Sequence, residues 1–230
     1  VAWNWKANSI PTINTDGTIQ SVVSANQAAG ISIVKYIGDG STSATIGHGL
    51  SAAPEMVIVK NLTSTDNWIV YNQYADASPA SGFLQLNSTA AFYSDSDAWG
   101  GGSGTEPTST LVTIGDGSTD GYTNQNGSAY IAYCFHSVSG FSKFGSYSGS
   151  ASAVTVTTGF QPDYVLIKNV DAVRRWPIFD YARSDFGSYL DASDSLAEQT
   201  DSTIEISVTS TGFVLPAGAN YTINSSGYDY

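Results

Sequence analysis

One stretch of the sequence occurs twice, and this repetition constrains the fold more than any other feature. Residues 54–72 read PEMVIVKNLTSTDNWIVYN, and residues 162–180 read PDYVLIKNVDAVRRWPIFD, aligned without a gap at an offset of 108 residues. Five identical pairs are Pro54/Pro162, Val57/Val165, Lys60/Lys168, Asn61/Asn169 and Trp68/Trp176. Self-similarity at a fixed spacing is typical of a duplicated structural unit. We therefore predict that the chain contains one unit twice.

Each copy predicts a β-hairpin. Residues 56–59 and 164–167 are continuous apolar runs of the kind found in strands buried on both faces, and each follows a proline. A second apolar run, led by tryptophan, follows each after a turn. Further short runs separated by Gly, Asp, Asn and Ser lie at 31–37, 83–86, 111–114, 130–135, 154–157, 204–208 and 213–215. This pattern predicts an all-β fold of two tandem β-sandwich (jelly-roll-like) units related by internal duplication, with residues 190–199 as the one short helix.

The predicted boundaries are a closing strand and linker at 1–29, a first β-unit at 30–138 and a second at 139–230. The first six residues, VAWNWK, resemble residues 131–135, IAYCF, which are expected to close the first unit. The corresponding strand of the second unit is expected after Tyr230. We expect it to come either from the N-terminal segment or from a longer protein of which this chain is part, because an unpaired strand position leaves an aggregation-prone edge.

The chain is acidic and poor in charged residues. A formal net charge of −12 and a pI near 4.1 argue against binding to nucleic acid or to an anionic membrane through a basic face, so neither nucleic acid nor a membrane is expected as a partner. The single cysteine, Cys134, excludes an internal disulfide framework, and its apolar neighbours predict a buried free thiol. No apolar stretch approaches the roughly 20 residues of a membrane span.

Known catalytic patterns are absent from the sequence, so we predict that the protein is not an enzyme. It contains no GxSxG elbow and no HExxH motif, and His48 lies in a Gly-His-Gly turn. A glycan-active enzyme would need two carboxylates flanking a sugar bond, for which Asp95 with Asp97 and Asp191 with Asp194 are the nearest pairs. Aspartates in such turns usually bond the local backbone, and we prefer that interpretation.

No cofactor is predicted, although calcium has a weak candidate site. Asp116 and Asp120 offer carboxylate oxygens in one predicted loop. Their spacing does not match the calcium-binding loop with its distal glutamate. Simple Asp-Gly hairpin turns are therefore the better interpretation of these two residues.

Three aromatic residues are the candidate ligand-binding residues. Tyr93, Trp99 and Tyr122 lie in predicted loops, which commonly carry binding residues. Trp99, beside a glycine run, could stack on a sugar ring or anchor its loop. The repeated tryptophans, prolines and lysines are instead predicted to serve packing: Trp68, Trp176, Pro54, Pro162, Lys60 and Lys168.

Several motifs in a fixed order resemble a known family. They are Trp3-Asn4-Trp5-Lys6, Gly47-His48-Gly49-Leu50 followed by Pro54, residues 143–149 (KFGSYSG), and Gly159-Phe160-Gln161-Pro162. Together they span nearly the whole chain and resemble an uncharacterised β-rich domain of tailed-phage virion proteins, of the tail-fibre or particle-protein type and often from marine phages. The resemblance implies a structural protein and transfers no catalytic residue.

The resemblance, the repeat and the composition together predict a function. We expect a phage virion structural protein on the particle surface, hence extracellular, as part of a tail fibre, spike or capsid decoration that contributes to host attachment by carbohydrate binding. The alternatives are a capsid or tail subunit without a receptor role and, less favoured, a glycan-active enzyme. The expected partners are other virion proteins, host-surface glycans and further copies of the chain, since fibres resembling this family are commonly trimers.

Overall fold

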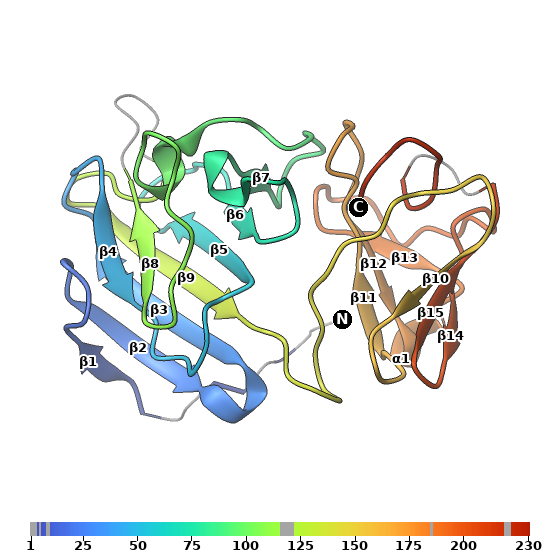
Figure 1. Ribbon diagram of the computed structural model, residues 1–230, viewed down its shortest axis with the longest axis horizontal. Helices are drawn as coiled ribbons and strands as arrows, with labels where there is room; N and C mark the ends of the chain where they lie inside the picture. Colours follow the sequence, from blue (N-terminus) through green and yellow to red (C-terminus); the bar gives the residue numbers. More distant parts are fainter. Residues whose placement is uncertain (1–3, 5, 8–9, 116–121, 185, 219–221) are drawn as a thin grey trace. The chain divides into compact units, whose positions relative to one another are not determined.

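The computed structural model describes residues 4, 6–7, 10–115, 122–184, 186–218 and 222–230. In this part of the chain the fold is all-β, as predicted, and its one helix is the short α1 (Tyr181–Ser184). The chain divides into two compact units (Figure 1). Unit 1 comprises residues 1–84 and 93–144, and unit 2 comprises residues 85–92 and 145–230.

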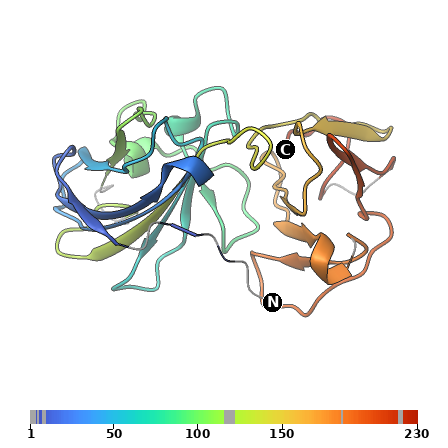
Figure 2. The ribbon, with the colours of Figure 1, turned by 90° about the horizontal axis from the view of Figure 1, so that it is seen from below.

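Unit 1 is built on a seven-stranded sheet in the order β1-β2-β3-β9-β5-β6-β7, antiparallel from β1 to β6. Its strands are β1 (Thr12–Asn14), β2 (Ser21–Asn26), β3 (Ile31–Ile37), β5 (Met56–Asn61), β6 (Ile69–Asn72), β7 (Leu84–Gln85) and β9 (Ala129–Phe135). A two-stranded sheet of β4 (Ala44–Gly47) and β8 (Leu111–Ile114) completes the unit. Figure 2 shows the large sheet as a curved layer, which is the normal consequence of strand twist.

The core of unit 1 lies between these two sheets. Along β9 the side chains alternate strictly between buried and half-buried, because successive residues of a strand point to opposite faces. Ala132 and Cys134 therefore join Ile46 and Val112 of the small sheet in one apolar cluster. The arrangement is sandwich-like.

The burial of Cys134 gives the first prediction. Burial raises the pKa of its thiol to about 12, so the reactive thiolate is scarce near neutral pH. We expect no alkylation of the native protein by iodoacetamide and complete alkylation in denaturant, measured by mass spectrometry. Modification of the native chain at the rate of a small-molecule thiol would show that the strand opens.

Unit 2 consists of two three-stranded sheets that enclose a second core. One has the order β10-β15-β14 and the other β11-β12-β13. The strands are β10 (Val154–Thr157), β11 (Tyr164–Leu166), β12 (Pro177–Asp180), β13 (Tyr189–Asp191), β14 (Ser207–Thr209) and β15 (Gly212–Leu215). Val165 and Phe179 of one sheet pack with Phe213 and Leu215 of the other.

The two predicted hairpins form with the same register. In unit 1 Val57 pairs with Tyr71, and in unit 2 Val165 pairs with Phe179, each residue 108 positions later. The turn contacts also recur: Lys60 Nζ donates to the Asp66 carbonyl at 2.9 Å. The corresponding bond, from Lys168 Nζ to the Arg174 carbonyl, is 2.7 Å long. Both repeated lysines therefore hold the same hairpin turn, and Pro54 and Pro162 are both buried at its start.

The surroundings of the repeated tryptophans differ. Trp68 is half-buried and stacks on Tyr133, with ring centroids 6.5 Å apart. Trp176 is only 2% exposed and donates from Nε1 to the carbonyls of Gln85 and Ser88, both at 3.1 Å. Both tryptophans pack against other side chains or backbone, and the segment that contains Gln85 and Ser88 is folded over Trp176.

Three features differ from the sequence-based description. Residues 12–26, predicted as linker, contain β1 and β2. Ser21 and Val23 of β2 point into the core, whereas Val22 between them is exposed. Residues 85–92 join unit 2 instead of the first unit, held there by bonds such as Phe92 N to the Val170 carbonyl. The predicted helix at 190–199 is wrong: β13 covers its start, and α1 comes earlier. The predicted closing strand at the N-terminus falls mainly on residues outside the described part.

Candidate functional site

The candidate site is a group of aromatic side chains on unit 1, which we call the aromatic site: Phe83, Tyr93 and Tyr122. Phe83 and Tyr93 exchange two backbone hydrogen bonds of 2.9 Å, which fixes the loop beside the strand region. The Phe83 ring lies 5.3 Å from the Tyr93 ring and 4.8 Å from the Tyr122 ring. Two of the three predicted ligand-binding residues are thus brought together by a phenylalanine that the sequence did not single out.

The three rings of the aromatic site differ in their exposure to solvent, and the exposed fraction decides which ring can contact a ligand. Phe83 is 1% exposed and serves as the base of the group, whereas Tyr93 is 54% exposed. Tyr122 is half-buried. A ring held against a buried partner presents its outer face with little conformational freedom left to lose on binding.

A carboxylate adjoins the aromatic site. Asp95 Oδ2 accepts a hydrogen bond of 3.1 Å from the Tyr122 hydroxyl. Its Oδ1 accepts one of 3.0 Å from the Asp97 amide, so Asp95 also caps the 3₁₀ turn Ser96–Trp99. Each carboxylate oxygen has two lone pairs. The arrangement can therefore combine stacking on Tyr93 with acceptance of a hydroxyl hydrogen bond at Asp95.

Trp99 is not part of this surface, which corrects its assignment as a ligand-binding residue. Its side chain is 1% exposed, its Nε1 donates to the Gly82 carbonyl at 2.9 Å, and its ring meets Tyr71 edge-on at 5.7 Å. A buried indole with a satisfied N–H is a core residue. Trp99 therefore anchors the loop, the alternative role considered for it.

The predicted calcium ligands Asp116 and Asp120 lie outside the described residues. Within the part of the chain that is described, no group of three or more His, Cys, Asp or Glu is arranged to hold a metal ion. Among the same residues, no helix is long and apolar enough to cross a membrane.

The second carboxylate pair, Asp191 and Asp194, forms ion pairs with one arginine of unit 2. Arg175 lies 3.3 Å from Asp191 Oδ2 and 3.5 Å from Asp194 Oδ2. Burial raises the pKa of Asp191, whose side chain is 1% exposed and whose Oδ1 has no hydrogen-bond partner among the described residues. The guanidinium of Arg175 opposes that shift. The two carboxylates thus share one cation instead of flanking an open site.

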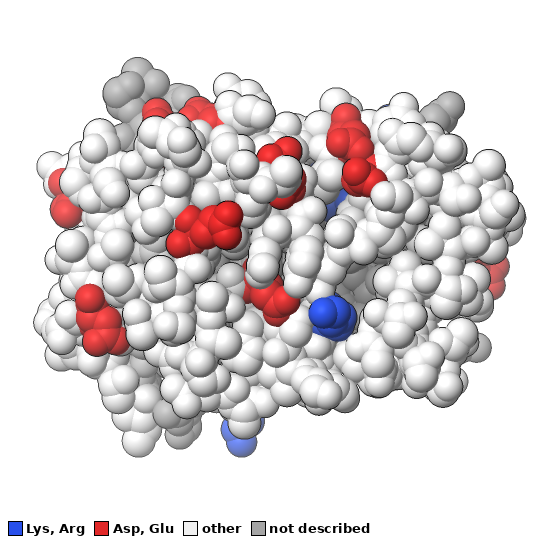
Figure 3. Space-filling model, viewed as in Figure 1, with Lys and Arg blue, Asp and Glu red and all other residues white. Residues whose placement is uncertain are grey.

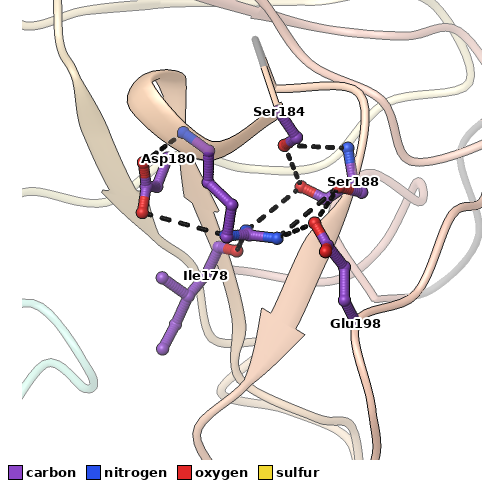
Figure 4. A network of polar contacts seen from close by, with 6 residues as sticks. Ile178, Asp180, Ser184, Ser188 and Glu198 are labelled. Carbon is purple, nitrogen blue, oxygen red and sulfur yellow. Dashed lines mark hydrogen bonds and ion pairs between the residues drawn. The ribbon is translucent and has the colours of Figure 1, made fainter. Parts of the chain in front are cut away.

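Arg183, whose side chain is 9% exposed, organises the neighbouring part of unit 2 (Figure 4). Arg183 donates its backbone N–H to Asp180 Oδ1 at 3.0 Å, and its side chain contacts Glu198 and the Ile178 carbonyl. The Ser188 hydroxyl donates to the same Glu198 carboxylate. These contacts tie β12 and α1 to Ser188, which directly precedes β13, and to Glu198.

The two histidines have local partners. His48 is fully buried, its Nδ1 accepts from the Leu50 amide, and its Nε2 lies 3.2 Å from the Thr108 carbonyl. Burial lowers its pKa, so it is neutral near pH 7. His136 Nδ1 lies 2.9 Å from the Ser137 carbonyl. All of these contacts join the rings to backbone atoms, and none of them forms part of a Ser-His-Asp arrangement.

Lys168 is a buried lysine at the start of the turn in the unit 2 hairpin. Burial, and then the nearby charge of Arg174, lower its pKa to about 8. The ammonium donates to the Thr89 carbonyl at 3.1 Å and lies 5.8 Å from the centre of the Trp176 ring. Thr89 belongs to the segment folded over Trp176, so these contacts of Lys168 join that segment to the hairpin.

The fold and site define a class: an acidic all-β protein of two β-sandwich-like units, with an aromatic group beside a carboxylate on the first. Acidic side chains form separate small groups on the face drawn in Figure 3, where few lysines or arginines appear. The whole chain, residues 1–230, matches a family described as a domain of unknown function (DUF7483), and it belongs to that family. No curated protein and no solved structure was found to match it.

Proposed function

We propose that this protein is a non-enzymatic structural module of a phage virion surface that binds neutral host glycans through the aromatic site. The observation that carries the glycan part is Tyr93, 54% exposed and supported from below by Phe83, with Asp95 nearby. An aromatic face packs against the apolar face of a sugar ring, and a carboxylate accepts from its hydroxyls. The virion part rests on the motif resemblance and on the acidic composition.

Neutral glycans are favoured over anionic ones by charge. The chain carries a formal net charge of −12, and the carboxylate of the aromatic site is itself an anion. Sulfated or sialylated sugars would be repelled at low ionic strength. The arrangement therefore predicts neutral oligosaccharides as ligands.

Replacement of Tyr93 by alanine should weaken glycan binding about two- to tenfold, because an aromatic stacking contact contributes about 0.5–1.5 kcal/mol. The ligand is chosen by screening the full chain on an array of neutral and anionic glycans, and affinity is then measured by calorimetry. Tyr93→Phe should retain most of the affinity, since the ring is kept.

The matched control is Tyr181→Ala, a tyrosine of unit 2 that is 47% exposed. It should leave binding unchanged. Equal losses for Tyr93→Ala and Tyr181→Ala, or an array without a neutral binder, would refute the glycan part of the proposal. Sustained hydrolysis of a bound glycan would contradict the non-enzymatic part.

A capsid or tail subunit without a receptor role is the second candidate. It is favoured by the small extent of the aromatic site, in which Tyr93 is the one ring that is mostly exposed. A glycan array on which the chain binds no glycan, together with tight association of the chain with purified virion shells, would support this candidate.

A further inference from the structure

The imidazole of His48 is fully buried, and its two ring nitrogens have opposite roles. Nδ1 accepts a hydrogen bond of 3.2 Å from the Leu50 amide, so this nitrogen carries no proton. Nε2 lies 3.2 Å from the Thr108 carbonyl and therefore carries the proton that it donates. Both nitrogens of a protonated imidazole are donors. A second proton on His48 would therefore break the hydrogen bond from Leu50.

The motif Gly47-His48-Gly49 places this ring through its two glycines. A Cβ at Gly47 would lie 1.8 Å from Asn14 Oδ1, so a side chain at this position would displace Asn14. Gly49 has a φ of 69°, a left-handed conformation that glycine adopts readily. The chain turns there, and the Leu50 amide comes back to the His48 ring.

The His48 ring contacts a mostly exposed segment, residues 105–110, which we call the strap. The strap forms no helix or strand, and it leads from the glycine run after Trp99 into β8. At one end the Thr105 amide donates to the Trp99 carbonyl at 2.9 Å. At the other end the Thr110 carbonyl accepts from the His48 amide at 3.3 Å. His48 therefore holds this end of the strap with both its backbone and its ring.

The strap passes near an aromatic part of the core. The charge of Glu106, in the strap, adds to the larger effect of burial in raising the pKa of Tyr71. Tyr71 is 2% exposed, and its ring meets the buried Trp99 ring at 5.7 Å. Movement of the strap away from unit 1 would therefore increase the exposure of Tyr71.

Charged groups on two other parts of unit 1 act on the His48 ring. Burial is the main cause that lowers its pKa, and the hydrogen bond to the Thr108 carbonyl partly opposes this effect. A positive charge on His136, which follows β9, lowers the pKa further, whereas the carboxylate of Asp16, between β1 and β2, raises it. Strand β3 contributes the uncharged Ser32 hydroxyl, which donates to the His48 carbonyl. The sum of these effects favours the neutral ring.

We propose that acid releases the strap from unit 1 and that His48 is the group whose protonation opens it. A proton added at Nδ1 removes the bond from Leu50, and a charged ring without a partner is strongly disfavoured at a fully buried position. Movement of the strap brings water to the ring, and hydration stabilises the charged form. The Thr108 and Thr110 carbonyls then lose their contacts with His48. Release of the strap does not depend on whether the aromatic site binds glycans.

The direction of the pKa shift of His48 sets the pH range of release. The pKa is lowered while the strap is closed, and in an open state with a hydrated ring it should be about 6.5. The closed strap is therefore most stable above about pH 7, and its stability falls as the pH falls through about 6.5 toward the lower pKa of the closed state. We expect the open fraction to increase about fivefold between about pH 7 and about pH 5.5.

Hydrogen exchange of the full chain, followed by NMR spectroscopy over this pH range, measures the opening. The amides of Thr105 and His48 bond across the two ends of the strap. Their protection factors, corrected for the intrinsic pH dependence of exchange, should fall about fivefold. The amide of Ala132, in the central strand β9 of the large sheet, should keep its protection. The opening should level off at the pH at which the His48 ring signals titrate.

Two histidine variants test the ring itself. His48→Gln keeps an amide donor for the Thr108 carbonyl but cannot be protonated, so the pH dependence of exchange should disappear. His136→Gln is the matched control and should retain it. Asp16→Asn, at an exposed position, leaves His48 in place and gives an answer even if His48→Gln does not fold. Without the Asp16 charge, the titration of the His48 ring and the pH at which opening levels off should both move to lower pH.

Each other outcome overturns the proposal. Loss of protection at Ala132 together with the strap would show that acid unfolds the whole sheet. Loss confined to the Leu50 amide would mean that the ring is protonated while the strap stays closed. Exchange that does not depend on pH, or a pH dependence that survives in His48→Gln, would remove His48 from the process. The same holds if Asp16→Asn moves the ring titration and leaves the opening unchanged.

Discussion

Replacing Trp99 with alanine is expected to lower the free energy of unfolding of unit 1 by about 3–5 kcal/mol. The indole is 1% exposed, and its loss leaves a cavity beside Tyr71 as well as an unpaired Gly82 carbonyl. Denaturant unfolding followed by far-ultraviolet circular dichroism measures the change. Because native proteins are stable by only about 5–15 kcal/mol, this single variant should remove a large share of the stability of unit 1.

Trp68→Ala is the matched control for that experiment. The Trp68 ring is half-buried and stacks on Tyr133 at the surface of the sheet, so the expected loss is about 1–2 kcal/mol. If the Trp99 variant were no less stable than the Trp68 variant, the placement of Trp99 as a core residue would be wrong. Trp99 would then return as a ligand-binding candidate.

The second large effect is expected at Asn124. Its side chain is fully buried, its Nδ2 donates to Asp39 Oδ1 and to the Ser41 carbonyl at 2.8 and 2.9 Å, and its Oδ1 accepts from the Asp39 amide at 3.0 Å. Asn124→Ala leaves these groups unsatisfied, and we expect a loss of about 2–4 kcal/mol. Thermal and denaturant unfolding of the variant measure it.

Asn224 supplies a parallel test in unit 2. It is also fully buried, with bonds from Nδ2 to the Ser152 and Pro216 carbonyls at 3.0 and 2.9 Å and from the Ser150 amide to Oδ1 at 2.7 Å. Asn224→Ala should therefore cost about as much as Asn124→Ala. Asn126→Ala, an exposed neighbour, is the control and should change stability by less than about 0.5 kcal/mol.

Unequal losses at the two asparagines would show that the two units are held together differently. Equal losses would support the proposal that a single structural unit is present twice, because the same side chain would close the same kind of loop in both. Asn124 and Asn224 precede Tyr130 and Tyr230 by the same number of positions. The hydroxyls of these tyrosines accept from the amides of Gln125 and Ser225 at 2.9 and 3.1 Å.

The hairpins could be predicted from the sequence because their determinants are local. The apolar run Met56–Val59 and the turn at Lys60 and Asn61 are close in the chain, so composition and spacing suffice. The strands β1 and β2 were missed because residues 12–26 are rich in polar residues, and only one face of β2 is buried. Their placement depends on β3, which lies across a turn from them.

The aromatic site could be predicted only in part. Tyr93 and Tyr122 were recognised as aromatic residues in loops, but Phe83, which joins them, belongs to a run that indicated a strand. Trp99 was predicted to lie in a loop in the same way as Tyr93 and Tyr122, so the sequence did not distinguish it from them. A buried and an exposed tryptophan beside a glycine run differ only in what the rest of the chain places around them.

The sequence by itself determined the all-β class, the repeated hairpin and the burial of Cys134, because alternation, turn residues and apolar runs act over a few positions. Tertiary structure alone decided that residues 85–92 join unit 2 over Trp176 and that Phe83 gathers Tyr93 and Tyr122. Both arrangements bring together residues far apart in the chain. Such contacts depend on the packing of whole sheets, which no local pattern encodes.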